Sequence, residues 1–176
     1  MAGHSHWKQI KLKKAASDQK RGKLFSKLLN AITIAAKTEP NPDFNPRLRT
    51  AILKAKEYQV PQENIMKAIL KSKESNSQLE EIILECYGPG GVALLIEAIT
   101  DKSSRTINEI KNILKEYDAK LSEPGSVRWA FEKKENDWQP KFTQKIEETQ
   151  KEKLLKLIEE LDSQDDVQKI TTNAEL

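Results

Sequence analysis

Basic residues are crowded into the start of this sequence. The first 27 residues contain eight Lys or Arg side chains and a single acid, Asp18. Cations that cluster on one surface release counterions when they neutralise phosphates, and this release produces affinity for nucleic acid. We therefore predict phosphate contacts in this segment and a smaller second patch further along the chain. The predicted phosphate contacts are Lys8, Lys11, Lys13, Lys14, Lys20, Arg21, Lys23 and Lys27, with Arg47 and Arg49 as the second patch.

An aromatic residue, Trp7, stands among His4, His6 and Lys8. Aromatic rings beside cations stack on unpaired bases, so Trp7 joins the candidate nucleic-acid-binding residues. The alternative is that the ring is buried and anchors the basic N-terminal arm, and both interpretations stay open. Two histidines and one distant cysteine do not make a zinc site, so no metal site is predicted.

The residues that would support catalysis are not arranged for it. Cleavage of phosphodiesters usually requires carboxylates that hold metal ions, and the six acids of residues 1–75 are scattered. The run YGPGG at residues 87–91 precedes a β-rich segment, whereas a phosphate-binding loop precedes a helix. Cys86 lies in a predicted strand with no evident base nearby. We predict no catalytic residue, no cofactor and a function in binding rather than catalysis.

The net charge of +3 conceals a strong asymmetry between the two halves. Residues 1–75 contain 16 Lys or Arg and 6 acids, a net charge of +10, whereas residues 76–176 contain 14 and 21, a net charge of −7. This division indicates that the first half meets a polyanion. The polar run KSKESNSQLEE marks a boundary, and the predicted domains are a basic helical domain, 1–76, and an α+β domain, 77–176.

The amino-acid composition also indicates the cellular compartment of the protein. A single cysteine excludes an internal disulfide and favours a reducing environment. The longest apolar run, GVALLIEAI, is too short to span a bilayer. The basic start has no apolar stretch typical of a secretory signal, and it is richer in lysine than a mitochondrial presequence. We predict a cytoplasmic protein with no membrane partner and no small-molecule substrate.

The spacing of apolar residues predicts helices in the first half. Leu24, Leu28, Ile32 and Ala35 recur on one face of a helix, with Ser17 as its N-cap. Its lysines are expected mainly on the exposed side: Lys20, Lys23, Lys27 and Lys37. Asn45-Pro46 starts a second helix that buries Leu48, Ile52 and Ala55. A third helix starts at Pro61 and turns Ile65 and Ile69 inward.

The second half changes to a strand-like pattern. EEIILECYG and GVALLIEAIT predict a hairpin closed by GPGG. Ser103 or Ser104 then caps a helix. SVRWAFEKK predicts a strand with Val127, Trp129 and Phe131 on one face, and WQPKFTQKIEE a weaker strand. EKLLKLIEELDS predicts an amphipathic helix and VQKITTN a last strand. The fold class is α+β: a three-helix domain followed by an α+β sandwich with helices on one face of an antiparallel sheet.

Five stretches of the sequence resemble one known family. These are GHSHW with KRGKLFSKL, then NPRLRTAILKAKEYQVPQENIMKAIL, YGPGGVALLIEAITDKSSRT, GSVRWAFEKK and, at the end, EKLLKLIEELDSQDDVQKITTNAEL. In order and nearly over the whole chain, they are similar to the YebC/PmpR, or TACO1-like, family. The resemblance implies a helical domain followed by two α+β domains, the third inserted into the second. Only Glu135–Asp137 stand where that insertion is usual, so the resemblance implies a form that lacks the third domain, deleted near 134–138.

The resemblance also implies a function. Family members are described as DNA-binding transcriptional regulators or as translational activators at the ribosome. The interpretation is a nucleic-acid-binding transcriptional regulator, with a translational activator that binds ribosomal RNA as the alternative and a protein-interaction adaptor as a third. Two positions depart from the family pattern, His6 and Gln62, where lysine is usual. Lysine outnumbers arginine 13 to 3 in residues 1–75, which favours phosphate contacts over readout of guanine.

Overall fold

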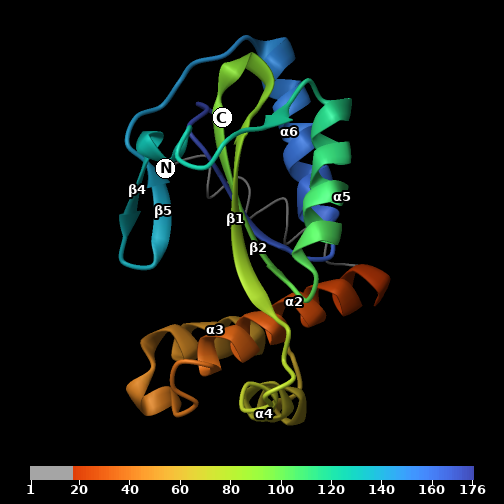
Figure 1. Ribbon diagram of the computed structural model, residues 1–176, viewed down its shortest axis with the longest axis vertical. Coiled ribbons are helices and arrows are strands. Elements are labelled where there is room, and N and C mark those ends of the chain that lie inside the picture. The colour runs from red at the N-terminus through yellow and green to blue at the C-terminus, as the bar shows by residue number, and fades with distance from the viewer. Residues whose placement is uncertain (1–17) are drawn as a thin grey trace. The chain divides into compact units, whose positions relative to one another are not determined.

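The computed structural model describes residues 18–176, and the chain divides into two compact units after Glu80 (Figure 1). In the first unit, the described residues form α2 (Asp18–Ala36), the 3-10 turn η1 (Pro42–Phe44), α3 (Pro46–Glu57) and α4 (Gln62–Lys71). The predicted apolar face of α2 is confirmed, because Leu24, Leu28 and Ile32 are buried in one core with residues of α3 and α4. The predicted N-cap, Ser17, lies outside the described residues.

The predicted start of α3 at Asn45-Pro46 is confirmed. The side-chain oxygen of Asn45 accepts a hydrogen bond from the Leu48 amide at 3.0 Å, which satisfies a donor of the first turn. Its amide nitrogen donates to the carbonyl oxygens of Ala35, at 2.8 Å, and Glu39, at 2.7 Å. One buried side chain thus joins the end of α2, the proline-rich turn and the start of α3.

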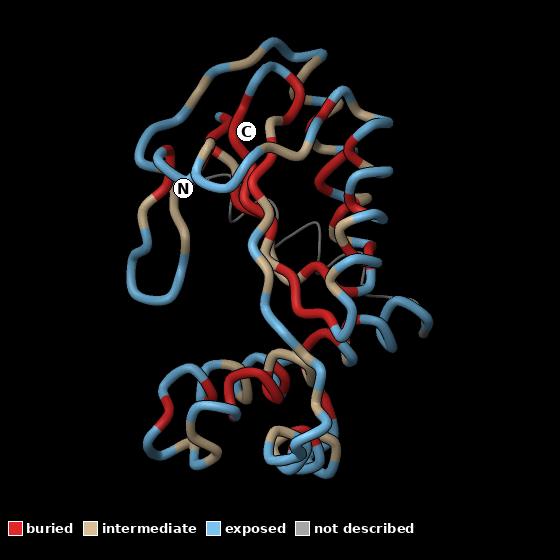
Figure 2. The backbone as a smooth tube through the Cα atoms, in the orientation of Figure 1, coloured by how far each residue is buried: buried red, intermediate tan, exposed pale blue. Residues whose placement is uncertain are grey.

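The second unit is built on a four-stranded antiparallel sheet with the order β3-β1-β2-β6. These strands are β1 (Glu80–Tyr87), β2 (Ala93–Thr100), β3 (Lys120–Leu121) and β6 (Val167–Thr172). The helices α5 (Ser103–Glu116) and α6 (Glu148–Ser163) lie side by side against one face (Figure 1). Figure 2 shows β2 largely buried, whereas β1 is exposed or intermediate over most of its length and buried only near its end. The predicted α+β class is confirmed.

The predicted hairpin between β1 and β2 is also confirmed, and glycine is needed at its tip. The 3-10 turn η2 (Pro89–Gly91) connects the strands, and the Gly88 amide donates to the Val92 carbonyl at 2.8 Å. Gly90 has φ 75°, and a Cβ atom there would lie 2.8 Å from the side chain of Ile146. A larger residue would meet both a strained backbone and a steric clash.

One predicted strand is wrong. Val127 and Phe131 are buried, but Trp129 is 62% exposed, because Arg128–Ala130 form a 3-10 turn, η3, instead of extended chain. The bend is held by Glu85, whose carboxylate accepts hydrogen bonds from the Val127 and Arg128 amides. Extended structure begins only at β4 (Phe131–Lys134), which pairs with β5 (Asp137–Pro140) in a separate hairpin.

The predicted cap of α5 is wrong as well. The helix begins at Ser103 with Lys102 as its N-cap, and no side chain makes the capping bond. The Thr100 hydroxyl accepts a hydrogen bond from the Lys102 amide at 3.0 Å instead. The Thr106 hydroxyl donates to Asp166 at 2.7 Å, which connects the first turn of α5 to the segment before β6. The helix start is therefore organised by tertiary contacts rather than by a local serine.

Candidate nucleic-acid interface

The start of α2 presents the first described group of predicted cations. Lys20, Arg21 and Lys23 are all exposed in its first two turns. The other predicted residues of this patch, Trp7, Lys8, Lys11, Lys13 and Lys14, lie outside the described residues. The beginning of α2 therefore exposes three cations within four residues of the chain.

Lys27 does not share this exposure. It is only 7% exposed, so the expectation that it lies on the exposed side of the helix is wrong. Its position explains the difference, because Lys27 follows Leu24 by three residues and precedes Leu28, and therefore borders the buried stripe. The structure accordingly leaves Lys27 out of the exposed cationic surface.

Arg47 and Arg49 occupy the start of α3 and are both exposed. The Arg49 guanidinium donates to the carbonyl oxygens of Pro42, at 2.7 Å, and Asp43, at 3.1 Å, so it also holds η1 against α3. Because Asn45 binds the end of α2, this patch lies at the opposite end of that helix from Lys20. At 1.5 Å per residue, the two patches are about 20 Å apart along α2.

Further exposed cations follow on α3 and α4. Lys54 and Lys56 lie in the last turn of α3, and Lys54 shares a helix face with Arg47 seven residues earlier. Lys67 pairs with Glu63 on α4 at 2.9 Å, with both side chains largely exposed. Lys54 follows Arg47 by seven residues and Lys56 follows Arg49 by seven, and this spacing is the sequence signal that could have added both lysines to the second patch.

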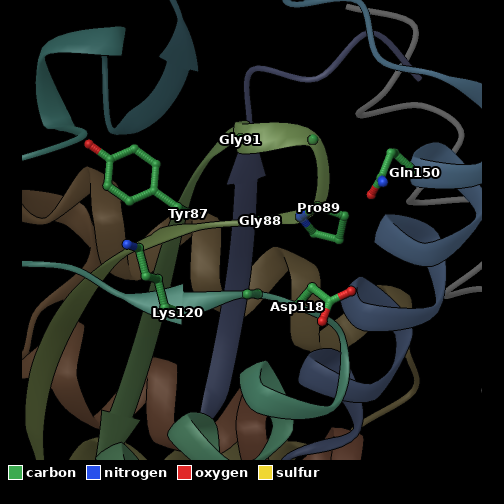
Figure 3. Close-up of a pocket in the computed structure, with 9 residues that line it drawn as sticks. Tyr87, Gly88, Pro89, Gly91, Asp118, Lys120 and Gln150 are labelled. Carbon is green, nitrogen blue, oxygen red and sulfur yellow. The ribbon is translucent and has the colours of Figure 1, made fainter.

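The YGPGG turn lies beside a cavity in the second unit, with a volume of about 660 Å³ (Figure 3). Asp118, Lys120 and Gln150 line it together with the turn. Asp118 forms an ion pair with Lys153, so this carboxylate is engaged within the fold. A β-strand follows the turn, and the backbone amide of Gly91 donates to Gly88 rather than facing an anion. The geometry is that of a closed hairpin and not of a phosphate-binding loop.

Cys86 is fully buried in β1, and burial followed by the nearby Glu85 charge raises its pKa to about 12. A thiol reacts as the thiolate, so the folded protein should be inert to alkylation. We expect iodoacetamide to leave native protein unmodified for hours at pH 8 and to label it within minutes in 8 M urea, as measured by intact mass. Rapid labelling of the native protein would contradict the buried placement of Cys86.

Over residues 18–176, no group of three or more His, Cys, Asp or Glu is placed to hold a metal ion. In the same residues, no helix is long and apolar enough to cross a membrane.

The fold and the charge pattern define the class of protein to which this chain belongs, one with a basic helical unit followed in the chain by an acidic α+β unit. Residues 5–75 match the family model of the TACO1/YebC protein N-terminal domain. Residues 79–136 and 132–174 match the TACO1/YebC second and third domain. The chain belongs to the TACO1/YebC family.

Curated relatives and a solved structure agree with this assignment. A protein of Solibacter usitatus is 46% identical over 142 residues, which cover 80% of this chain and 57% of the relative. A protein of Aquifex aeolicus is 50% identical over 137 residues, which cover 76% of this chain and 55% of the relative. Both are named "Probable transcriptional regulatory protein". The chain thus spans just over half the length of these relatives. A crystal structure of a conserved hypothetical protein from Aquifex aeolicus superposes with a TM-score of 0.83 and 32% identity, covering 92% of this chain and 93% of the other.

Proposed function

We propose that this chain binds nucleic acid through its first unit and regulates gene expression, with DNA-binding transcriptional regulation as the first candidate. The observation that carries the proposal is the charge division, +10 in residues 1–75 and −7 in the rest. Exposed cations on α2 and α3 are consistent with it. The names of these relatives, which describe probable transcriptional regulators, point to the same class of function.

A second candidate function is translational activation through ribosomal RNA. The preponderance of lysine over arginine in residues 1–75, 13 to 3, favours it. Lysine contacts phosphate as a point charge, whereas arginine is the usual bidentate reader of guanine. A surface of this kind recognises the shape and charge of a structured RNA better than a DNA sequence.

We also propose that this chain is a short form of the family without the inserted third domain. The β4–β5 hairpin supports this, because Lys134 pairs with Asp137 and only Glu135 and Asn136 remain between them. Glu135 adopts φ 57°, as a tight turn between paired strands requires. A short turn thus stands where the family pattern places a whole domain, and nucleic-acid binding would depend on the two units that remain.

Charge reversal at the start of α2 tests the binding proposal. We expect the K20E/R21E/K23E variant to bind a 24-base-pair duplex and a ribosomal RNA hairpin at least about tenfold more weakly at 100 mM salt. The slope of log affinity against log salt should become shallower by about 2 to 3, because fewer counterions are released. Fluorescence anisotropy with labelled nucleic acid measures both quantities.

The matched control reverses three exposed lysines of the acidic unit, Lys111, Lys115 and Lys156. The K111E/K115E/K156E variant changes the net charge equally and should alter affinity less than about twofold. Equal losses in both variants would show only a net-charge effect and contradict a binding surface on α2. An unchanged affinity and salt slope in K20E/R21E/K23E would contradict the proposal as well.

Sedimentation of cell lysate on a sucrose gradient separates the candidate functions. Co-migration with ribosomal particles that is lost after RNase treatment would favour translation. Absence from those fractions, with crosslinking to promoter DNA, would favour transcription. Failure of both, with recovery of a protein partner, would favour the adaptor and contradict nucleic-acid binding.

A further inference from the structure

Two large aromatic side chains stand together on the surface of the second unit. Trp129 is 62% exposed and Phe142 is 44% exposed. Their ring centroids are 5.7 Å apart and their planes are inclined by 27°, so the two rings are stacked. The neighbouring core, which includes Val127, Ala130 and Phe131, is closed without them. An exposed tryptophan that is not needed by the core indicates a surface with a binding role.

Hydrogen bonds hold this aromatic pair in place. The Trp129 indole nitrogen donates to the Ser126 carbonyl at 2.7 Å, which sets the orientation of the ring. The Lys141 amide donates to the Ala130 carbonyl at 2.9 Å, so the chain before Phe142 is fixed to the chain after Trp129. A surface that is ordered before binding loses little conformational entropy when a ligand arrives.

Each ring of the aromatic pair directly follows a cation in the chain, Arg128 before Trp129 and Lys141 before Phe142, although the unit as a whole is acidic. A third aromatic residue, Trp138, has the Arg128 guanidinium 5.6 Å and the Lys133 ammonium 5.9 Å from its ring centroid. Residues 119–146 carry a net charge of +2, whereas the remainder of residues 81–176 carries −8. Two nearby acids are paired already, Glu132 with Lys134 and Asp137 with Lys169. The segment that carries the aromatic pair is therefore positive within an otherwise acidic unit.

We propose that Trp129 and Phe142 form a stacking platform for unpaired bases of a single-stranded nucleic acid, with the cations of the same segment binding its phosphates. Stacking on exposed aromatic rings beside lysine and arginine is how proteins bind single strands with little sequence preference. A continuous duplex does not present base faces in this way, so the platform distinguishes unpaired from paired segments. This inference rests on the proposed function and extends it to the second unit.

Substitution of Trp129 tests the platform directly in the full chain. With a fluorescein-labelled U12 oligonucleotide, W129A should bind about 5- to 50-fold more weakly, while a 12-base-pair duplex should bind within about twofold of wild type. The salt slope should not change, because loss of stacking releases no counterions. W129F keeps an aromatic face and should recover most of the affinity. U12 should quench the tryptophan fluorescence of wild type more than that of W129F.

The matched control is F44A, which removes a 76% exposed aromatic residue from η1 in the first unit and should leave U12 binding unchanged. Equal thermal unfolding midpoints of W129A and wild type would establish that a loss of binding is not a loss of folding. If K20E/R21E/K23E weakens duplex binding but W129A binds U12 normally, the proposed function holds and the stacking platform is wrong. Equal losses of affinity for U12 and for the duplex in W129A would also overturn the stacking platform. A failure of W129F to recover affinity for U12 would overturn it as well.

Discussion

Replacement of Glu85 by glutamine is expected to lower the free energy of unfolding by about 3 kcal/mol. The side chain is 2% exposed, and its carboxylate accepts hydrogen bonds from the amides of Gly125 at 2.7 Å, Val127 at 2.9 Å and Arg128 at 3.1 Å. Glutamine has the same shape, but its NH₂ group would face backbone N–H donors that it cannot satisfy. The Arg128 guanidinium, 3.4 Å from the carboxylate, would also lose its negative partner.

The same contacts make this stabilisation depend on pH. Burial by itself raises the pKa of Glu85. The hydrogen bonds from the backbone amides of Gly125, Val127 and Arg128, together with the Arg128 charge, lower the pKa by more than burial raises it. The net pKa of Glu85 therefore lies below the ordinary 4.5. A carboxyl whose pKa is lowered by folding contributes fully above its ordinary pKa and loses that contribution as the pH falls through the lowered value. The difference in unfolding free energy between wild type and E85Q should be constant from about pH 8 to 6 and shrink below about pH 4.5.

The matched control is the same substitution at Glu97, on the neighbouring strand β2. Burial raises the pKa of Glu97, and among the described residues its Oε2 atom has no hydrogen-bond partner. Its ionisation therefore opposes folding as the pH rises, so E97Q should leave the free energy of unfolding at pH 7 unchanged or increase it slightly. Urea unfolding followed by circular dichroism at several pH values measures both variants. Equal losses in E85Q and E97Q, or a pH-independent difference for E85Q, would contradict this account.

Replacement of Asn45 by alanine is expected to cost about 2 to 4 kcal/mol of unfolding free energy. Alanine removes the cap of the Leu48 amide and leaves the Ala35 and Glu39 carbonyl oxygens without their donor. Asn45 is 7% exposed, so water has little access to replace these three bonds. Urea unfolding of the full chain, monitored by circular dichroism, gives the difference directly.

Two further variants separate the cap from the other contacts of Asn45. N45D keeps the capping oxygen but places a carboxylate oxygen against two carbonyl oxygens, so it should remain at least about 1 kcal/mol less stable than wild type. N41A removes an exposed cap of η1, which accepts from the Asp43 amide at 2.9 Å, and should cost less than about 1 kcal/mol. Wild-type stability of N45D would show that only the cap of Asn45 contributes to stability.

Local patterns were sufficient to predict most elements of this fold. The i, i+4 spacing of Leu24, Leu28 and Ile32 predicts the buried face of α2, because a helical period of 3.6 residues needs no information from elsewhere. Asn45-Pro46 predicts the start of α3, since both the cap and the fixed φ of proline act within a few residues. The glycines of residues 88–91 predict the β1–β2 turn for the same reason.

The errors arose where a distant residue competes with the local pattern. Alternating apolar residues predict a strand through Trp129, but Glu85, about forty positions earlier, binds the amides of Val127 and Arg128 and bends the chain there. The exposed Trp129–Phe142 pair is therefore absent from the sequence-based candidates. The error at Lys27 has a local cause instead: counting lysines places it with the exposed cations, but its spacing to Leu24 and Leu28 puts it at the edge of the buried stripe, where it is 7% exposed.

The sequence by itself determined which cations are candidates for the interface and to which family the chain belongs. Net charge, cation clusters and motifs can all be found without knowledge of tertiary contacts. Only the tertiary structure decided which of the described cations are exposed, that the Lys20 and Arg47 patches lie at opposite ends of α2, and that Trp129 stacks on Phe142 at the surface. The physical reason is that exposure and proximity depend on contacts between residues distant in sequence, such as Asn45 with Ala35 and Glu85 with Val127. Such contacts leave no periodic signal in the chain.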